Sequence, residues 1–222
     1  MALTALVPRL VTIAVLAVTF MAFTAVVALG WLATPDHDVL VFMAGGWHEQ
    51  LHTLFQGIAL LGGIEATTLL MIGLAVFLIR RGEAGDAWVF AAFVAAVVFE
   101  LLYKFNLPHP SPSGTVAHGD GPSISDLFLR STGPHNSFPS GHMVRTVVVY
   151  GLLAFVIRRL APWPWVRVLV IPSAIVIIVV VAFDRLYLGV HWESDVVGGL
   201  LLGAIALVGA TVWLDRPRRP DN

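Results

Sequence analysis

Residues 10–35 read LVTIAVLAVTFMAFTAVVALGWLATP, a run of 26 residues that carries no charge between Arg9 and Asp36. A helix needs about 20 predominantly apolar residues to cross the hydrocarbon core of a bilayer. The apolar part of a secretory signal peptide is only about 7–15 residues long, so this run is too long for one. We therefore expect a retained first membrane span over residues 10–33.

The rest of the chain has the same apolar character. Of its 222 residues, 58% are hydrophobic and only 12% are charged, with a mean hydropathy of +0.86. Soluble domains carry about 25% charged residues, so the composition predicts an all-α polytopic membrane protein with six transmembrane helices in one domain over residues 1–222. The expected spans are residues 10–33, 53–79, 87–103, 140–157, 166–183 and 195–214, with a long polar loop over residues 104–139.

The distribution of basic residues predicts the orientation of this bundle. If both termini lie on one side, that side receives nine of the thirteen basic residues: Arg9, Arg80, Arg81, Arg158, Arg159, Arg167, Arg216, Arg218 and Arg219. Lys and Arg collect on the cytoplasmic side of membrane proteins. All eight histidines fall on the opposite side. Any chemistry that they carry is therefore expected at the outer face of the cytoplasmic membrane.

The composition also excludes several classes of function. A net charge of −1 leaves no basic surface for a nucleic acid. The chain has no cysteine, which excludes disulfides, thiolate metal sites and cysteine nucleophiles. A polar, histidine-bearing stretch over residues 36–52 is expected to lie at the membrane interface. The pairs Gly62-Gly63 and Gly198-Gly199 indicate close packing between helices.

Three polar clusters lie where predicted spans end on the outer side. They are Lys104 to Pro112, Pro139 to His142, and Asp184 to Asp195. In the second cluster, Ser140 is a favourable N-cap and Gly141 lets the backbone approach a ligand closely. The start of the following helix offers unpaired N–H groups to an anion, with His142 in the first turn.

The third cluster places a carboxylate beside a histidine. His191 and Asp195 are four residues apart, so a helix brings both to one face. The carboxylate can then hold one imidazole nitrogen and leave the other free to act as a nucleophile. Lys104 and Arg185 add positive charge. Two histidines around an anion site suit phosphoryl transfer through a phosphohistidine, and the cations make a metal or other cofactor unnecessary.

These clusters resemble the signature of the type 2 phosphatidic acid phosphatase (PAP2) family, which shares its fold with vanadium haloperoxidases. The signature is a Lys, six residues and Arg-Pro; then Pro-Ser-Gly-His; then Ser-Arg, five residues, His, three residues and Asp. The matching positions are Lys104 and Pro112, then Pro139, Ser140, Gly141 and His142, then Arg185, His191 and Asp195. The resemblance covers roughly residues 87 to 214.

The resemblance implies a role for each matching residue. His191 is the expected nucleophile, Asp195 orients it, and His142 is the general acid that protonates the leaving group. The groups implied to hold the phosphate oxygens are Lys104, Arg185, Ser140 and the N–H of Gly141. Water then releases phosphate from His191.

The first cluster departs from the family pattern. Ser111 stands in place of the family's Arg, and His109 stands where many members carry a further Arg; Asp184 also replaces the Ser of the third cluster. A serine cannot make the bidentate contact of a guanidinium. Arg145, three residues after His142, is our hypothesis for the replacement of the missing charge, and Ser111 itself is a further candidate for phosphate binding. The alternative is that the site is weakened or repurposed.

Structural roles compete with these functional ones. Lys104 lies four residues after Glu100 and can simply pair with it. Arg145 can bridge to Glu65 or Glu100 inside the bundle. The intramembrane acids Glu65 and Glu100 are themselves more readily explained by hydrogen bonds between helices than by catalysis.

The sequence as a whole predicts a membrane-embedded lipid phosphatase. Its partners would be a lipid phosphate substrate and the surrounding membrane lipids, with a polyprenyl diphosphate as the first substrate choice and phosphatidylglycerophosphate or phosphatidic acid next. A lipid phosphotransferase that uses the same phosphohistidine, and a lipid-binding member without turnover, remain open. The sequence does not determine the oligomeric state.

Overall fold

A computed structural model describes residues 3–113, 117–119 and 136–216. Within these ranges the chain is helical and has no strand, apart from one isolated antiparallel bridge between Pro110 and Asn136. The elements are α1 (Leu3–Ala28), α2 (Ala33–Gly45), η1 (Glu49–Leu51), α3 (His52–Gly62), α4 (Ile64–Arg80), η2 (Ala84–Trp88), α5 (Val89–Asn106), α7 (Gly141–Leu160), α8 (Pro164–Tyr187) and α9 (Glu193–Leu214). Four residues used in the orientation prediction lie outside the described residues: Arg130, His135, Arg218 and Arg219.

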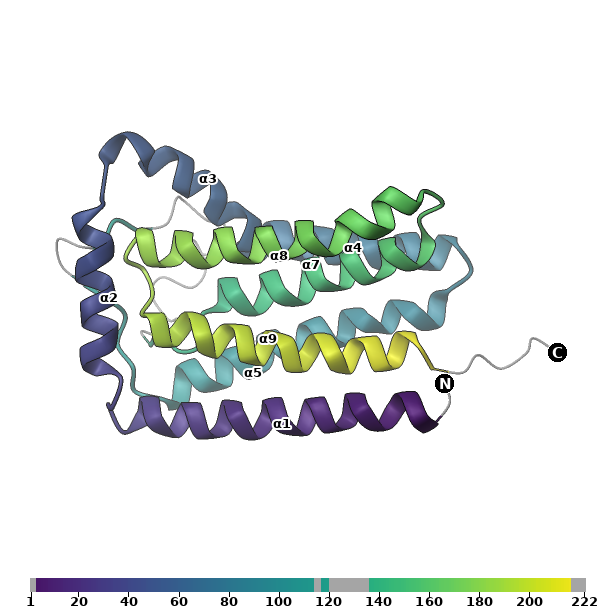
Figure 1. The fold of residues 1–222 in the computed structure, drawn as a ribbon, viewed down its shortest axis with the longest axis horizontal. Coiled ribbons are helices and arrows are strands. Elements are labelled where there is room, and N and C mark those ends of the chain that lie inside the picture. The colour runs from purple at the N-terminus through teal and green to yellow at the C-terminus, as the bar shows by residue number, and fades with distance from the viewer. Residues whose placement is uncertain (1–2, 114–116, 120–135, 217–222) are drawn as a thin grey trace.

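The long helices form a bundle, with α7 packed against both α8 and α9, and α1 packed along α9. Figure 1 shows α2 lying across one end of this bundle and α3 sloping back from that end towards α4. The predicted all-helical architecture is therefore confirmed. The polar stretch after the first span forms α2 and the short η1 turn.

In the part of the chain that the structure describes, five helical segments are long and apolar enough to cross a membrane: Leu6–Ala28, Glu49–Arg80, Ala84–Asn106, Pro164–Tyr187 and Glu193–Leu214. The expected fourth span corresponds to α7, which contains Arg145, Arg158 and Arg159 and is not among these segments. More than half of the 20 residues of α7 are buried, against α5, α8 and α9. A helix enclosed by protein does not need a uniformly apolar surface. The composition of the helices thus supports five spans, and the prediction of six is not confirmed.

The expected second span is broken at Gly63. This residue has extended backbone angles (φ −60°, ψ 150°) and separates α3 from α4. At Gly62, an added Cβ would lie 2.8 Å from Oγ1 of Thr146 and 3.1 Å from Cδ2 of His142. The close packing predicted for the Gly62-Gly63 pair is confirmed, and it brings the end of α3 against the first turns of α7.

A second close approach fixes the segment that precedes α7. Phe138 is completely buried and its ring lies over Gly198 of α9, where an added Cβ would be 2.7 Å from Cζ of Phe138. At Gly199 an added Cβ would lie 2.6 Å from the carbonyl oxygen of Ser140. The absence of a side chain at both glycines therefore lets the start of α7 pack directly on α9.

The two ends of the bundle differ in their polar residues. Helices α5 and α8 end, and α7 and α9 begin, at the end that α2 crosses, so all three clusters meet there. At the other end, Arg9 pairs with Asp215 at 2.5 Å, and Asp86 receives Arg159 at 3.3 Å and Arg216 at 2.9 Å. The chain thus carries its histidine clusters at one end, and the pairs of Arg9, Arg159 and Arg216 with Asp215 and Asp86 at the other.

Candidate active site

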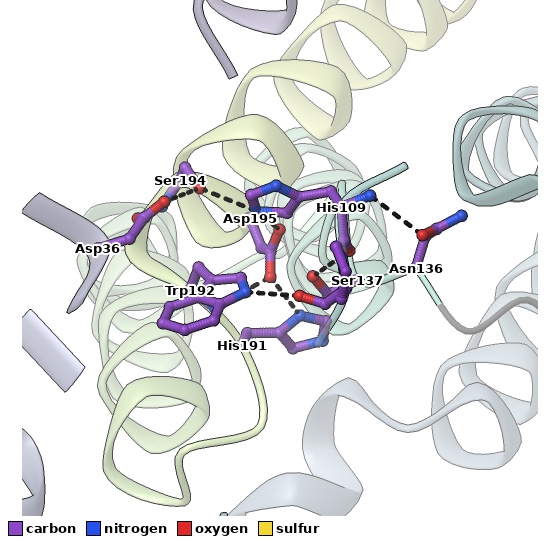
Figure 2. Close-up of polar contacts among 9 residues, drawn as sticks. Asp36, His109, Asn136, Ser137, His191, Trp192, Ser194 and Asp195 are labelled. Atoms are coloured by element: carbon purple, nitrogen blue, oxygen red, sulfur yellow. Dashed lines mark hydrogen bonds and ion pairs between the residues drawn. The ribbon is translucent and has the colours of Figure 1, made fainter. Parts of the chain in front are cut away.

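The predicted histidine–carboxylate pair is formed. Nδ1 of His191 lies 3.1 Å from Oδ2 of Asp195, whose side chain is completely buried at the start of α9 (Figure 2). The same Oδ2 also accepts the backbone N–H of Trp192 at 2.9 Å. Because an ionised carboxylate can only accept, the Nδ1 atom of His191 must carry the ring proton. The Nε2 atom then holds a lone pair and can attack an electrophile.

A backbone bond joins the second cluster to the third. The N–H of Ser140 donates to the carbonyl oxygen of Asp195 at 3.0 Å, and the carbonyl oxygen of Ser140 accepts the N–H of Val144 at 3.1 Å. Ser140 occupies the predicted N-cap position of α7, and its side chain makes no capping bond. Its Oγ atom is buried without a hydrogen-bond partner among the described residues. A bound phosphate oxygen would satisfy it.

Gly141 serves a second purpose that the sequence does not reveal. A Cβ at this position would overlap the Glu100 carboxylate and would lie 2.7 Å from Nη1 of Arg145. The Glu100–Arg145 pair therefore lies directly against the first residue of α7.

Glu100 holds both nearby cations. Its Oε1 lies 3.0 Å from Nζ of Lys104, and its Oε2 lies 3.1 Å from Nη1 of Arg145. Arg145 also donates from Nε to the carbonyl oxygen of Gly62 at 3.2 Å. The structural pairings considered for Lys104 and Arg145 with Glu100 are thus confirmed. Because two cations share one carboxylate, this cluster retains one positive charge.

Arg185 is completely buried and pairs with Asp184, which also accepts from its Nε at 2.9 Å. Asp184 is the residue that replaces the expected Ser of the third cluster. Arg185, Arg145, His191 and Lys104 all lie close enough to His142 for their charges to act on its ring. The structure therefore brings the predicted histidines and cations together around the start of α7.

Ser111 is the one candidate that the structure leaves outside this group. Its side chain is exposed, and it makes no hydrogen bond with any of the described residues. His109, two residues earlier, points instead at the buried carboxylate: its Nε2 lies 3.3 Å from Oδ1 of Asp195. The loop of the first cluster thus contributes a histidine to the site.

Two further polar residues were missed by the sequence analysis. Asp36 of α2 is buried and accepts from Ser194 at the start of α9, from the backbone N–H at 2.8 Å and from Oγ at 2.7 Å. An acidic residue at the N-terminus of another helix is electrostatically favourable. The sequence signal for Asp36 was weak, because a charge at the end of an apolar run is common at any membrane interface.

A family model confirms the resemblance that the motifs indicate. Residues 87–219 match the model of the PAP2 superfamily. The chain belongs to the PAP2 superfamily. The match includes every one of the candidate site residues, from Lys104 in the first cluster to Asp195 in the third. Its apolar helices and its PAP2 fold make it an integral membrane protein.

Named relatives share parts of this PAP2 chain. The undecaprenyl-diphosphatase of Sulfolobus acidocaldarius is 35% identical over 142 residues, which are 64% of this chain and 58% of the relative. Phosphatidylglycerophosphatase B of Bacillus subtilis is 41% identical over 70 residues, which are 31% of this chain and 34% of the relative. The chain spans less than two thirds of the length of the curated relatives it matches.

A solved structure shows the same fold. The PAP2-type phosphatidylglycerophosphate phosphatase of Bacillus subtilis superposes with a TM-score of 0.79 at 22% identity, over 93% of this chain and 98% of the other. At this identity the likeness concerns the fold of the backbone. It includes the part of the chain before residue 87 that the family model does not cover.

Proposed function

We propose that this chain is a lipid phosphate phosphatase that works through a phosphohistidine on His191. The observation that carries the proposal is the pairing of His191 with Asp195 directly beside the start of α7. That helix start offers the N–H groups that follow Ser140. It also offers the Ser140 hydroxyl, which is buried and has no hydrogen-bond partner among the described residues. A nucleophile and an anion site therefore lie next to each other.

In the first step, Nε2 of His191 attacks phosphorus and forms an N–P bond. The bond from phosphorus to the leaving oxygen breaks, and its electron pair stays on that oxygen. In a lipid diphosphate this is the oxygen that bridges the two phosphates, so the lipid leaves as its monophosphate; in a phosphomonoester it is the oxygen bonded to the lipid carbon. His142 gives a proton to the leaving oxygen as general acid. Asp195 stabilises the positive charge that develops on the His191 ring, because its Oδ2 accepts the Nδ1 proton.

In the second step, a water attacks the phosphorus of the phosphohistidine. The proton of the water passes to His142, the N–P bond breaks, and its electron pair returns to His191. Inorganic phosphate leaves, and both histidines regain their starting protonation states. An acceptor alcohol in place of the water would make the chain a phosphotransferase.

The phosphate oxygens carry negative charge that the protein must balance. Lys104, Arg145 and Arg185 are the cations near His142, and Glu100 neutralises only one of the first two. We propose that Lys104 and Arg145 together supply the positive charge that the family's arginine provides and that Ser111 cannot. Donors of this kind contribute about 10²–10³-fold to rate. Ser140 Oγ and the N–H of Gly141 supply neutral donors.

We infer that the site faces away from the cytoplasm. Helix α1 begins and α9 ends at the end that carries Arg80, Arg81 and Arg159, while the histidines among the described residues lie at the other end. Basic residues favour the cytoplasmic side. Helix α7 completes the crossing as a sixth span: its 20 residues reach about 30 Å, the thickness of the hydrocarbon core.

The substrate we propose first is a polyprenyl diphosphate, with phosphatidylglycerophosphate and phosphatidic acid next. Relatives named as an undecaprenyl-diphosphatase and as a phosphatidylglycerophosphatase support this order. The polar site lies at the ends of lipid-facing helices, so the lipid tail can enter sideways while the phosphate reaches His191.

The experiment is phosphate release in detergent from a panel of lipid phosphates, with a chelator present. Wild type is compared with His191→Ala and with His37→Ala, because His37 is an exposed histidine on α2. We expect release by wild type and His37→Ala, and none by His191→Ala. Transfer of phosphate to an added alcohol instead of water identifies a phosphotransferase. Tight binding of a lipid phosphate without release contradicts the proposal.

A further inference from the structure

The second oxygen of the Asp195 carboxylate faces a second histidine. Oδ1 of Asp195 lies 3.3 Å from Nε2 of His109, while Oδ2 holds His191 (Figure 2). The Asp195 side chain is completely buried, and that of His109 is 18% exposed. Among the described residues, Oδ1 has no well-formed hydrogen bond, so His109 is its nearest polar partner there. One carboxylate therefore lies between two imidazole rings.

The surrounding bonds determine which nitrogen of His109 carries a proton. Nε2 of His109 also lies 3.4 Å from Oγ of Ser194. That hydroxyl donates its hydrogen to Oδ2 of Asp36 at 2.7 Å, so it presents a lone pair to His109. Asp195 and Ser194 both offer acceptors to Nε2, which must then be protonated. The protonated Nε2 of His109 therefore lies within ion-pair distance of the Asp195 carboxylate, without a well-aligned hydrogen bond to Oδ1.

The loop that carries His109 is held in place by its backbone. The N–H of His109 donates to Oδ1 of Asn136 at 3.0 Å, and its carbonyl oxygen accepts the N–H of Ser137 at 2.8 Å. The carbonyl oxygen of the next residue, Pro110, accepts a hydrogen bond from Nε1 of Trp192 at 2.7 Å. The ring thus approaches Asp195 from a fixed position that does not depend on its own contact with the carboxylate.

We propose that His109 is a positioning residue that acts on His191 through Asp195; this inference rests on the proposed function of the site. A donor at Oδ1 fixes the plane of the carboxylate, so Oδ2 stays directed at Nδ1 of His191 when that ring becomes charged. In this proposal, His109 does not hold phosphate, and it does not take over the role of the family's arginine that is missing at position 111. Asp36 and Ser194 extend the network, because they orient the hydroxyl that borders the His109 ring.

The kinetic test compares His109→Ala and His109→Gln with wild type on the best lipid phosphate. We expect His109→Ala to lower kcat by about 10–100-fold with little change in KM. The reason is that the His109 ring supports Asp195, which orients the reacting His191, and does not touch substrate. His109→Gln should recover most of the loss, since its amide N–H can reach Oδ1. His37→Ala is the control and should behave as wild type. An unchanged kcat in His109→Ala overturns the proposal.

A double-mutant cycle separates positioning from a general structural effect. In an Asp195→Ala background, His109→Ala should have no further effect on kcat, because the group through which it acts is missing. Loss by the same factor in both backgrounds overturns the proposal, since His109 would then act independently of Asp195.

A second measurement does not depend on turnover. In protein labelled with ¹⁵N-histidine, the Nδ1–H resonance of His191 is assigned by its absence from His191→Ala. We expect it to move or broaden in His109→Ala and to return in His109→Gln; an unchanged resonance in His109→Ala overturns the proposal. If wild type releases phosphate from no lipid, the proposed function fails, and this resonance still decides whether His109 positions the Asp195–His191 pair.

Discussion

The backbone N–H of Ser140 donates to the carbonyl oxygen of Asp195 over 3.0 Å. This bond joins the first residues of α7 to the first turn of α9, and it involves no side chain. The anion-binding helix start and the carboxylate that orients His191 are therefore held together by the main chain. Side-chain substitutions at either position can change the chemistry while this backbone bond persists. Their effects on activity can therefore be separated from loss of the local structure.

Replacement of Ser140 by alanine should separate activity from stability. The hydroxyl is buried without a hydrogen-bond partner among the described residues, so its removal should leave the thermal unfolding midpoint unchanged or slightly raised. If Oγ binds a phosphate oxygen, phosphate release should fall by about 10²-fold. A variant with normal activity would contradict a phosphate role for this hydroxyl.

Asp195→Asn should abolish most activity with the fold intact. The amide of the new asparagine can donate to Nδ1 of His191. The ring proton would then lie on Nε2, which would have no lone pair with which to attack phosphorus. In other systems, a substitution of this kind at an orienting carboxylate lowers kcat by about 10⁴-fold. The measurement is kcat for phosphate release, with size-exclusion behaviour as the check on folding. Activity close to that of wild type would show that Asp195 does not orient the nucleophile.

Gly141→Ala should disrupt the site through Glu100. The added methyl would overlap the carboxylate that holds Lys104 and Arg145, so the cations must move. We expect loss of phosphate release and destabilisation by about 1–3 kcal/mol, measured by chemical or thermal unfolding. Gly73→Ala on α4 is the matched control, because nothing lies within 4 Å of a Cβ there. That variant should retain both activity and stability.

Arg145 offers a direct test of charge replacement in the altered first cluster. Arg145→Ala should lower phosphate release by about 10²–10³-fold, and Arg145→Lys should retain part of the activity because it keeps the charge. Arg80→Ala, at the opposite end of the bundle, serves as the control for loss of one arginine. If Arg145→Ala keeps full activity, the residue only bridges Glu100 and Gly62.

The thermal stability of Arg145→Ala should be measured alongside its activity. Removal of one member of a buried ion pair lowers stability by about 3–5 kcal/mol, because the other charge stays buried without a partner. Glu100 still has Lys104 at 3.0 Å, so we expect a smaller loss of stability in Arg145→Ala. A variant that is folded yet inactive therefore points to the phosphate role.

Much of the site could be predicted from the sequence because local spacing governs it. The four-residue separation of His191 and Asp195, and the helix start after Ser140, are set by contacts within a few residues. The positions of the five segments that are apolar enough to cross a membrane also follow from composition. Local pattern was sufficient wherever the geometry depends on a single helix.

Contacts between distant segments could not be predicted in this way. The pairing of Asp36 with Ser194 joins residues 158 positions apart, and the approach of His109 to Asp195 depends on how the first-cluster loop folds back. The break at Gly63 arises because the end of α3 packs on His142 and Thr146 of α7. Each feature requires a partner that periodicity along one segment does not identify.

The enclosure of α7 has a consequence for how the chain is assembled in the membrane. An arginine within an isolated helix opposes its insertion into a bilayer, and α7 carries Arg145 near its start. Glu100 of α5, which is made earlier in synthesis, supplies the counter-charge for that arginine. Integration of α7 is therefore coupled to the prior placement of α5. We therefore expect the helices to assemble in the order in which they are synthesised. The Glu100–Arg145 ion pair beside the site would then also join α5 to α7 during assembly.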